Sequence, residues 1–290
     1  MTEKFSEIRI LDNFYQTSSF YPMPVMLVST LNETGTTNLG PYSLCFPYVV
    51  TGGEKHSMLL IARATSNTAQ NIIRSKVCSL NFIPDKKKFM KNCVQLGFPG
   101  ETTEQKMKNS IFTLVPSTRS GSPPNGLTKF PDIVGEAVQV MECSWDETIP
   151  IQPTPTSAGS SYLVLVIDKL VMKQKWKDAL IKGKGFPRLP IDFGFRDNIR
   201  FWFSKHSKPY SIKVPGNKAA PVEAVQYACT RFDPDIKWEK EACAKIVKVP
   251  NVFLKRVIGG VVKAAKKEGI TTITPEFMDR VQDKRSSEKK

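Results

Sequence analysis

Short apolar runs separated by turn residues fill most of the chain before residue 175. The runs at 24–31, 58–62 and 77–83 are rich in Val, Leu and Ile and have the length of buried strands. The runs at 132–145 and 161–174 are longer and also read as strands. Because many strands follow one another with few helices between them, the pattern predicts a mainly β domain, either a barrel or a sandwich.

The first of these strands leads into a tight turn. Residues 32–35, Asn-Glu-Thr-Gly, are typical of a hairpin, because Gly35 can adopt a positive φ without steric cost. The next strand, at 36–50, contains Gly40 and Pro41. An interruption of this kind indicates a β-bulge or a close approach of the backbone to another group.

Two later segments lack a clear period. Residues 84–131 are loop-rich and polar, with a helix pattern only at 101–110, and the piece at 116–127 has the composition of a flexible surface loop. Residues 175–235 are expected to form an irregular segment packed on the β domain, with a strand at 198–203. We interpret the aromatic residues of this segment as packing groups rather than as a binding platform. They are Phe186, Phe193, Phe195, Phe201, Trp202 and Phe203.

The pattern becomes helical from Trp238. Amphipathic stretches at 238–249 and 253–269 end at Pro250 and Gly269, and a third begins with Thr274 as its cap. We therefore expect a small three-helix module after the β domain.

These patterns give the fold class and the domain limits. The fold class is mainly β (α+β), with a β domain at 1–215 and a linker at 216–236. The helical module occupies 237–284, and a charged tail at 285–290 is expected to be disordered.

Composition indicates where the protein works and the charge of its partners, but not which reaction it catalyses. The formal net charge is +15, with a pI near 9.5, which favours anionic partners without choosing among them. Residues 236–290 hold 14 basic and 7 acidic residues, a net charge of +7. No apolar run approaches the roughly 20 residues that cross a bilayer, and the N-terminus lacks a signal-peptide core. We expect a cytoplasmic protein without membrane contact.

Metal and triad chemistry are poorly supported. The chain has two histidines and no C-x-x-C pair, so we expect no metal site and no Ser-His-Asp or Cys-His arrangement. The cysteines are expected to be reduced and mostly buried. They are Cys45, Cys78, Cys93, Cys143, Cys229 and Cys243.

The stretch at 62–72, ARATSNTAQNI, combines a strand end with a helix start. Free backbone amides and the positive end of the helix dipole make a helix N-terminus a site for anions. Ser66, Asn67 and Thr68 add polar donors, and Arg63 adds a forked cation that suits phosphate. The stretch can therefore hold a phosphate. The alternative is that Ser66 or Thr68 caps a helix while Arg63 is solvated.

The stretch at 38–46, NLGPYSLCF, offers a second subsite. Its exposed amides can bond the edge of a planar heterocycle while apolar neighbours pack on the faces of the ring. A plain β-bulge remains the alternative.

Taken in order, these segments resemble the flavin reductase-like family of FMN-binding split barrels, over about residues 14–215. The family's P-x-P-V-x-L-V-[ST]-T opening corresponds to the stretch from Pro22 to Thr30. Its N-x-x-P-[FY]-S turn and R-x-S-x-T-x-x-N-I phosphate segment follow at 38–43 and 63–72, the latter with a shifted Ser66. The strands at 132–145 and 162–172 look like the closing strands of that family.

The resemblance implies an FMN-binding split β-barrel and assigns roles to individual residues. The ring of FMN would be bordered by Asn38, Pro41, Tyr42, Ser43 and Cys45. The phosphate or ribityl chain would be surrounded by Arg63, Ser66, Asn67, Thr68 and Asn71. The implied protein is a homodimeric oxidoreductase. Its electron donor is NAD(P)H or an acidic electron-transfer protein such as ferredoxin or rubredoxin.

Residues 238–284 resemble a second family, the C-terminal domain of the dark-operative protochlorophyllide reductase large subunit. The pattern is carried by Trp238, Ala242, Val249, Pro250, Gly269, Ile270, Ile273, Thr274 and Glu276. We infer no chlorophyll chemistry from this module, and its role stays open. Gly259 and Gly260 lie inside its second helix, where each is expected to weaken the helix by about 1 kcal/mol relative to Ala.

Three functions follow from these observations. The leading hypothesis is an FMN-dependent oxidoreductase related to flavin reductases and flavoredoxins, which holds FMN as a prosthetic group or turns it over as a substrate. The second is a nucleic-acid-binding protein, suggested by the charge and by the lysine-rich stretch at 255–267, although no aromatic stacking pattern accompanies it. In the third, the helical module docks an acidic electron-transfer partner onto the flavin domain. The alternative to a flavin enzyme is a basic nucleic-acid-binding or protein-docking protein in which the barrel is only a scaffold.

Overall fold

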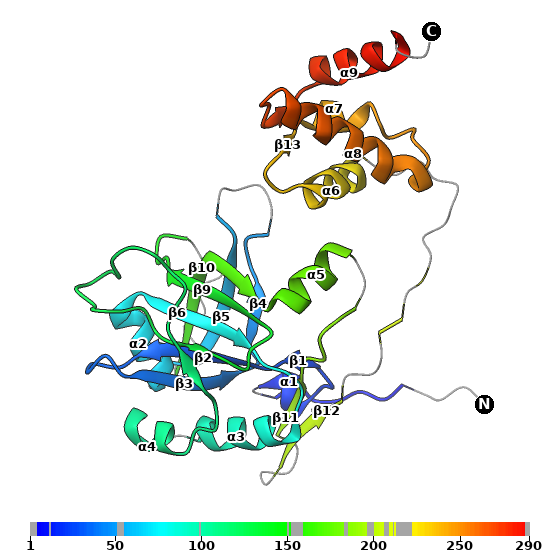
Figure 1. The fold of residues 1–290 in the computed structure, drawn as a ribbon. Coiled ribbons are helices and arrows are strands. Elements are labelled where there is room, and N and C mark those ends of the chain that lie inside the picture. The colour runs from blue at the N-terminus through cyan, green and yellow to red at the C-terminus, as the bar shows by residue number, and fades with distance from the viewer. Residues whose placement is uncertain are drawn as a thin grey trace. The chain divides into compact units, whose positions relative to one another are not determined.

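The chain folds into two compact units, Met1–Pro209 and Tyr210–Lys290 (Figure 1). The structure, a computed structural model, describes residues 5–11, 13–50, 55–98, 100–149, 151, 159–182, 185–195, 200–205, 209–210, 212 and 222–287. Among these residues, none of the helices combines the length and the apolar character that a bilayer span requires.

A curled, seven-stranded antiparallel sheet forms the centre of the first unit (Figure 1). Its strand order is β3-β2-β6-β9-β10-β5-β4. The strands are β2 (Met26–Leu31), β3 (Thr37–Tyr42), β4 (Cys45–Pro47), β5 (Ser57–Arg63), β6 (Val77–Phe82), β9 (Gln139–Trp145) and β10 (Ser160–Met172). The mainly β fold class is thereby confirmed.

Smaller elements surround this sheet. A three-stranded sheet has the order β1-β11-β12, and β7 pairs with β8. These strands are β1 (Met23–Pro24), β7 (Leu114–Val115), β8 (Ile133–Val134), β11 (Ile191–Phe195) and β12 (Phe201–Ser204). The helices of this unit are α1 (Phe14–Thr17), α2 (Asn67–Ser75), α3 (Lys87–Gly97), α4 (Thr103–Lys108) and α5 (Gln174–Lys182).

The hairpin between β2 and β3 forms as the sequence predicts. Gly35 has a φ of 78°, and the Asn32 side chain accepts hydrogen bonds from the backbone N–H groups of Thr34 and Thr36 at 3.1 and 2.7 Å. The predicted break or bulge at Gly40 and Pro41 is wrong, because both lie within β3, which pairs with β2 in unbroken register. Since β3 is the edge strand of the sheet, a proline is tolerated there.

Gly40 marks the predicted close approach of the backbone to another group, here the side chain of Thr68. A Cβ atom added to Gly40 would lie 2.5 Å from the Oγ1 atom of Thr68, in the first turn of α2. The helix itself begins where the sequence predicts, with Ser66 as its cap: the Ser66 hydroxyl accepts a 3.2 Å hydrogen bond from the N–H of Ala69. The missing side chain at Gly40 therefore lets β3 lie against the start of α2.

The segments that the sequence assigned to loops contain more regular structure than expected. α3 was missed, although Phe89, Met90, Cys93 and Leu96 recur at helical spacing and are all buried. The helix pattern at 101–110 is confirmed by α4, which begins with a capping box. The segment expected to be irregular contains α5, β11 and β12.

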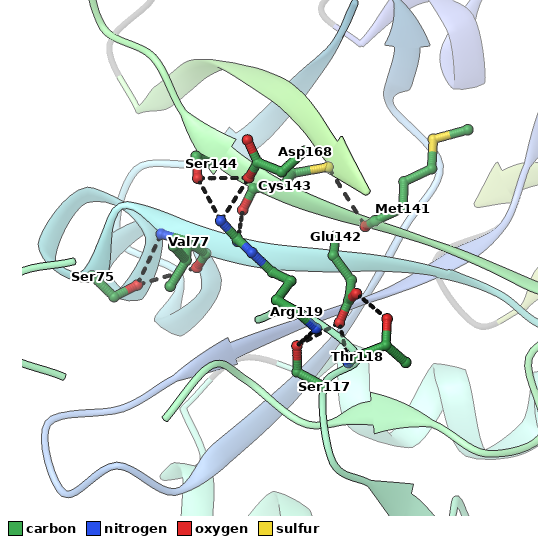
Figure 2. Close-up of polar contacts among 10 residues, drawn as sticks. All are labelled: Ser75, Val77, Ser117, Thr118, Arg119, Met141, Glu142, Cys143, Ser144 and Asp168. Carbon is green, nitrogen blue, oxygen red and sulfur yellow. Dashed lines mark hydrogen bonds and ion pairs between the residues drawn. The ribbon is translucent and has the colours of Figure 1, made fainter. Parts of the chain in front are cut away.

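The loop at 116–127, expected to be flexible, is anchored to β9 (Figure 2). Glu142 is fully buried and accepts three hydrogen bonds from the loop. The donors are the hydroxyls of Ser117 and Thr118, at 2.5 and 2.6 Å, and the Thr118 N–H, at 3.0 Å. Composition predicts a surface loop correctly but cannot reveal this distant carboxylate.

Arg119 anchors the same loop a second time. Its guanidinium lies 2.7 Å from the Asp168 carboxylate and donates to the Cys143 carbonyl and the Ser144 hydroxyl at 3.1 and 3.0 Å (Figure 2). The pairing of β10 with β9 shifts register between Ile167 and Lys169, so Asp168 lies at the irregularity. The bulged strand thus presents a carboxylate to the loop.

The second unit has its own hydrophobic core. Its described helices are α6 (Val222–Phe232), α7 (Lys240–Ala244), α8 (Asn251–Lys267) and α9 (Pro275–Ser287). A short parallel pair joins β13 (Lys237–Trp238) to β14 (Thr272–Ile273).

The expected boundaries of this unit need correction. Residues 216–236 are not simply a linker, because α6 lies within them and buries Val225 and Cys229 in the core. The described residues form four helices rather than three, and α9 continues to Ser287, into the tail expected to be disordered. Gly259 has a packing reason: a Cβ there would lie 3.0 Å from the ring of Phe232 at the end of α6.

The Gly40 contact gives a stability prediction. Gly40→Ala should lower the free energy of unfolding by about 1–3 kcal/mol, because the added methyl group collides with Thr68. Urea unfolding measures this loss. Gly135→Ala is the control, since the atom nearest to its Cβ, the Thr113 carbonyl oxygen, would lie 3.4 Å away. Equal effects of the two substitutions would contradict the packing argument.

Candidate functional site

A pocket of about 320 Å³ lies in the first unit, beside the end of β3. Four of the residues predicted to bind a cofactor line it. They are Pro41, Tyr42, Ser43 and Arg63. The structure therefore brings the 38–46 stretch and the 62–72 stretch to one place, although 20 residues separate Ser43 from Arg63.

A hydrogen bond connects this pocket to the start of α2. The Tyr42 hydroxyl donates to the Ser66 hydroxyl at 3.0 Å, and Ser66 caps the helix. Asn67, the first residue of α2, donates from its side chain to the Glu101 carbonyl at 3.2 Å. The wall of the pocket and the N-terminus of the helix are thus held together by side chains.

The N-terminus of α2 retains unused donors. Within the part of the chain that the structure describes, the N–H groups of Asn67 and Thr68 have no acceptor. The Arg63 side chain is exposed and forms no hydrogen bond or ion pair with a described residue. A guanidinium and two free amides at the positive end of a helix dipole make a site suited to a phosphate.

Lys106 adds a cation that the sequence interpretation missed. It lies in α4 and is half-buried, and this burial lowers the pKa of its amino group. The nearby charges of Glu101 and Arg63 act in opposite directions on the same pKa, Glu101 raising it and Arg63 lowering it. Lys106 therefore lies near Arg63, and sequence spacing alone gives no sign of this, since 43 residues separate them.

The other six predicted residues do not line the pocket: Ser66, Asn67 and Thr68 lie at the start of α2, and Asn38, Cys45 and Asn71 are buried elsewhere. Asn38 is buried and accepts a hydrogen bond from the Thr103 hydroxyl at 3.3 Å, and Asn71 donates to the Thr30 hydroxyl at 3.1 Å. Cys45 lies in the core of the sheet, and burial raises its pKa far above the usual range. Asn38 and Asn71 are thus held by buried hydrogen bonds, and Cys45 by packing in the core.

The opposite walls of the pocket come from segments that the sequence interpretation left unassigned. α3 and the residue after it contribute Cys93, Val94, Gly97 and Phe98. The sequence did offer one signal for this wall: apolar residues recur at helical spacing along α3.

β11 and β12 contribute the remaining wall. Phe201 and Phe203 line the pocket, with ring centroids 6.3 Å apart, so these two aromatics do more than pack the core. Asp192 also lines it while buried, and its carboxylate accepts a 2.6 Å hydrogen bond from the Gly194 N–H.

The arrangement suits a ligand that is flat at one end and anionic at the other. Aromatic and aliphatic side chains line most of the pocket, and polar groups lie at the β3 turn, at Arg63 and at Asp192. A second hollow of about 300 Å³ shares Phe98 but includes none of the residues predicted from the sequence. In the described ranges, no group of three or more His, Cys, Asp or Glu side chains is placed to hold a metal ion.

Comparison with known proteins supports the fold. No family model matches the chain, and no curated protein matches its sequence. Among solved structures, a flavoredoxin from Methanosarcina acetivorans is 18% identical, and the match covers 74% of this chain and 98% of that protein with a TM-score of 0.51. The chain has a split-barrel fold.

Two further matches agree with this assignment. Component B of nitrilotriacetate monooxygenase from Bacillus cereus is 15% identical, with 72% of this chain and all of that one covered at a TM-score of 0.52. An FMN-binding protein from Thermus thermophilus with bound p-hydroxybenzaldehyde is 12% identical, with 73% and 100% covered at a TM-score of 0.50. At such identities the likeness establishes the fold alone. The resemblance of the C-terminal unit to the protochlorophyllide reductase domain stays a prediction.

The buried cysteines give a chemical prediction. All six thiols are free and buried, and burial raises the pKa of Cys93, on the pocket wall, to about 12. Because the thiolate is the reactive form, the native protein should react with none of its cysteines at about pH 8 in a DTNB assay. Six should react after unfolding in guanidinium chloride. A fast-reacting thiol in the native protein would contradict this burial.

Proposed function

We propose that this chain binds FMN in the pocket and acts as an FMN-dependent oxidoreductase of the flavin reductase-like or flavoredoxin-like type. One observation carries the proposal: Pro41, Tyr42, Ser43 and Arg63 meet in one pocket beside the open N-terminus of α2. The fold supports it, because a flavoredoxin and an FMN-binding protein share it.

The residues present fit both ends of this cofactor. Arg63 and the free N–H groups of Asn67 and Thr68 would hold the phosphate, with the Lys106 charge nearby. The apolar walls would pack on the isoalloxazine ring, and backbone amides of the turn after β3 would bond its polar edge. Gly40 matters here because a side chain would push the two subsites apart.

Bound FMN supplies the transfer of a hydride or of two electrons between a donor and an acceptor. The chain's own contribution is to orient the ring and to exclude water with the aromatic wall of β12. NAD(P)H or an electron-transfer protein would be the donor.

We also infer that the protein is a homodimer. Large apolar side chains near the N-terminus are highly exposed in the single chain, among them Phe5 at 106% and Phe20 at 85%. Such surface favours burial against a second copy. Light scattering should give twice the chain mass of 32.5 kDa. A monomer at micromolar concentration would contradict the inference.

Arg63 provides the sharpest test of the binding mode. Arg63→Ala should weaken FMN binding by about ten- to a hundredfold, because a charged hydrogen bond contributes about 1.5–3 kcal/mol. Riboflavin, which lacks the phosphate, should bind the variant and the wild type within about twofold of each other. Quenching of flavin fluorescence measures both affinities.

The control is Lys108→Ala, which removes an exposed cation two residues beyond Lys106 and should alter neither affinity. An equal loss of FMN and riboflavin binding in Arg63→Ala would assign Arg63 a purely structural role. A wild-type protein that binds no FMN would contradict the proposed function.

A further inference from the structure

The solvent face of α3 and its cap carries a concentrated positive charge. Lys86, Lys87, Lys88 and Lys91 are all exposed, and none forms an ion pair with a described residue. We call these four residues the α3 basic strip. Asp85 is the only acidic residue between positions 84 and 98. The strip is therefore almost uniformly positive.

The strip runs directly to the candidate site. Lys87 and Lys91 precede Val94 by seven and three residues, so all three lie on one face of the helix. At 1.5 Å per residue, they lie about 10 and 4.5 Å along the axis from Val94. Val94 lines the pocket, as does Phe98 just beyond the helix, and the Phe98 side chain is 59% exposed.

The convex shape of this surface favours a protein partner over a small molecule. Small-molecule sites are concave, whereas the strip lies on the outer, convex side of a helix and contributes no residue to either hollow described above. A nucleotide donor would leave these lysines mostly in water. A protein with an acidic surface can contact the whole strip and the exposed aromatic side chain of Phe98 at once.

We propose that the α3 basic strip docks an acidic electron-transfer protein, which delivers electrons to the pocket beside Phe98. This inference rests on the proposed function, since it names the donor of that same site. Two molecules of a one-electron donor are each oxidised by one electron. Together they supply the two electrons that convert FMN to FMNH₂, and water supplies the two protons.

The C-terminal unit is a second basic surface, with Arg256, Lys263 and Lys267 exposed along α8. The expectation that this unit docks the partner stays a prediction. The case for the α3 strip is stronger, because the strip shares a folded unit with the pocket and four nearby residues, Cys93, Val94, Gly97 and Phe98, line that pocket.

The test uses the double variant Lys87→Glu, Lys91→Glu in the full chain. Lys87 is the first residue of α3, where a glutamate interacts favourably with the helix dipole, so the variant should fold. The matched control is Lys173→Glu, Lys177→Glu, two exposed lysines at α5, which contributes no residue to the pocket. Both variants change the net charge equally.

Two readouts separate docking from chemistry. The first is the affinity of each protein, without flavin, for an acidic [2Fe–2S] ferredoxin at low ionic strength. The second is the rate at which that ferredoxin, in its reduced form, reduces the FMN-loaded protein, compared with the rate given by NADPH. The α3 variant should lose about tenfold or more in affinity and in the ferredoxin rate, and salt of about 0.5 M should abolish the difference. The NADPH rate and the α5 variant should be unaffected.

Four results would overturn the inference. The wild type could fail to bind ferredoxin at low salt, or the α3 variant could keep the wild-type affinity for ferredoxin. The α5 variant could lose as much ferredoxin affinity as the α3 variant, or the α3 variant could lose as much of its rate with NADPH as with ferredoxin. Failure to bind FMN would contradict the proposed function instead. The affinity of the flavin-free protein would still decide whether the strip docks the ferredoxin.

Discussion

The architecture of the site depends on one close contact, the approach of the β3 backbone at Gly40 to Thr68 in the first turn of α2. Packing at this distance is available only to a residue without a side chain. The Tyr42 hydroxyl then reaches the Ser66 cap at 3.0 Å. Because of this contact, the turn after β3 and the open end of a helix dipole belong to one site.

A second glycine brings in the opposite wall. A Cβ added to Gly97, at the end of α3, would lie 3.1 Å from the ring of Pro41. α3 therefore lies close against β3 and places Val94 and Phe98 at the pocket. Since split barrels share this fold at very low sequence identity, the proposal of FMN chemistry depends on these side chains and on Arg63 rather than on the fold itself.

The sequence predicted those parts of the structure that depend on local signals. The β2–β3 hairpin depends on Gly35 and Asn32, and the start of α2 depends on Ser66, all within a few residues of the element concerned. α3 was missed because four lysines hide the apolar period of Phe89, Met90, Cys93 and Leu96. Phe203 reaches the pocket, and Lys106 comes under the influence of the Arg63 charge, through tertiary folding that no local pattern specifies. In the same way, the glycine at 259 looked unfavourable for a helix until its contact with Phe232 was known.

The central claim is that the pocket holds one FMN per chain. Its most direct measurement is the visible absorption spectrum of the protein after FMN has been added and the excess removed by gel filtration. The account predicts the bands of oxidised flavin at about one equivalent per chain, shifted from those of free FMN because the ring lies among aromatic side chains. A colourless protein that retains no flavin would contradict the account and leave the split barrel as a fold without this cofactor.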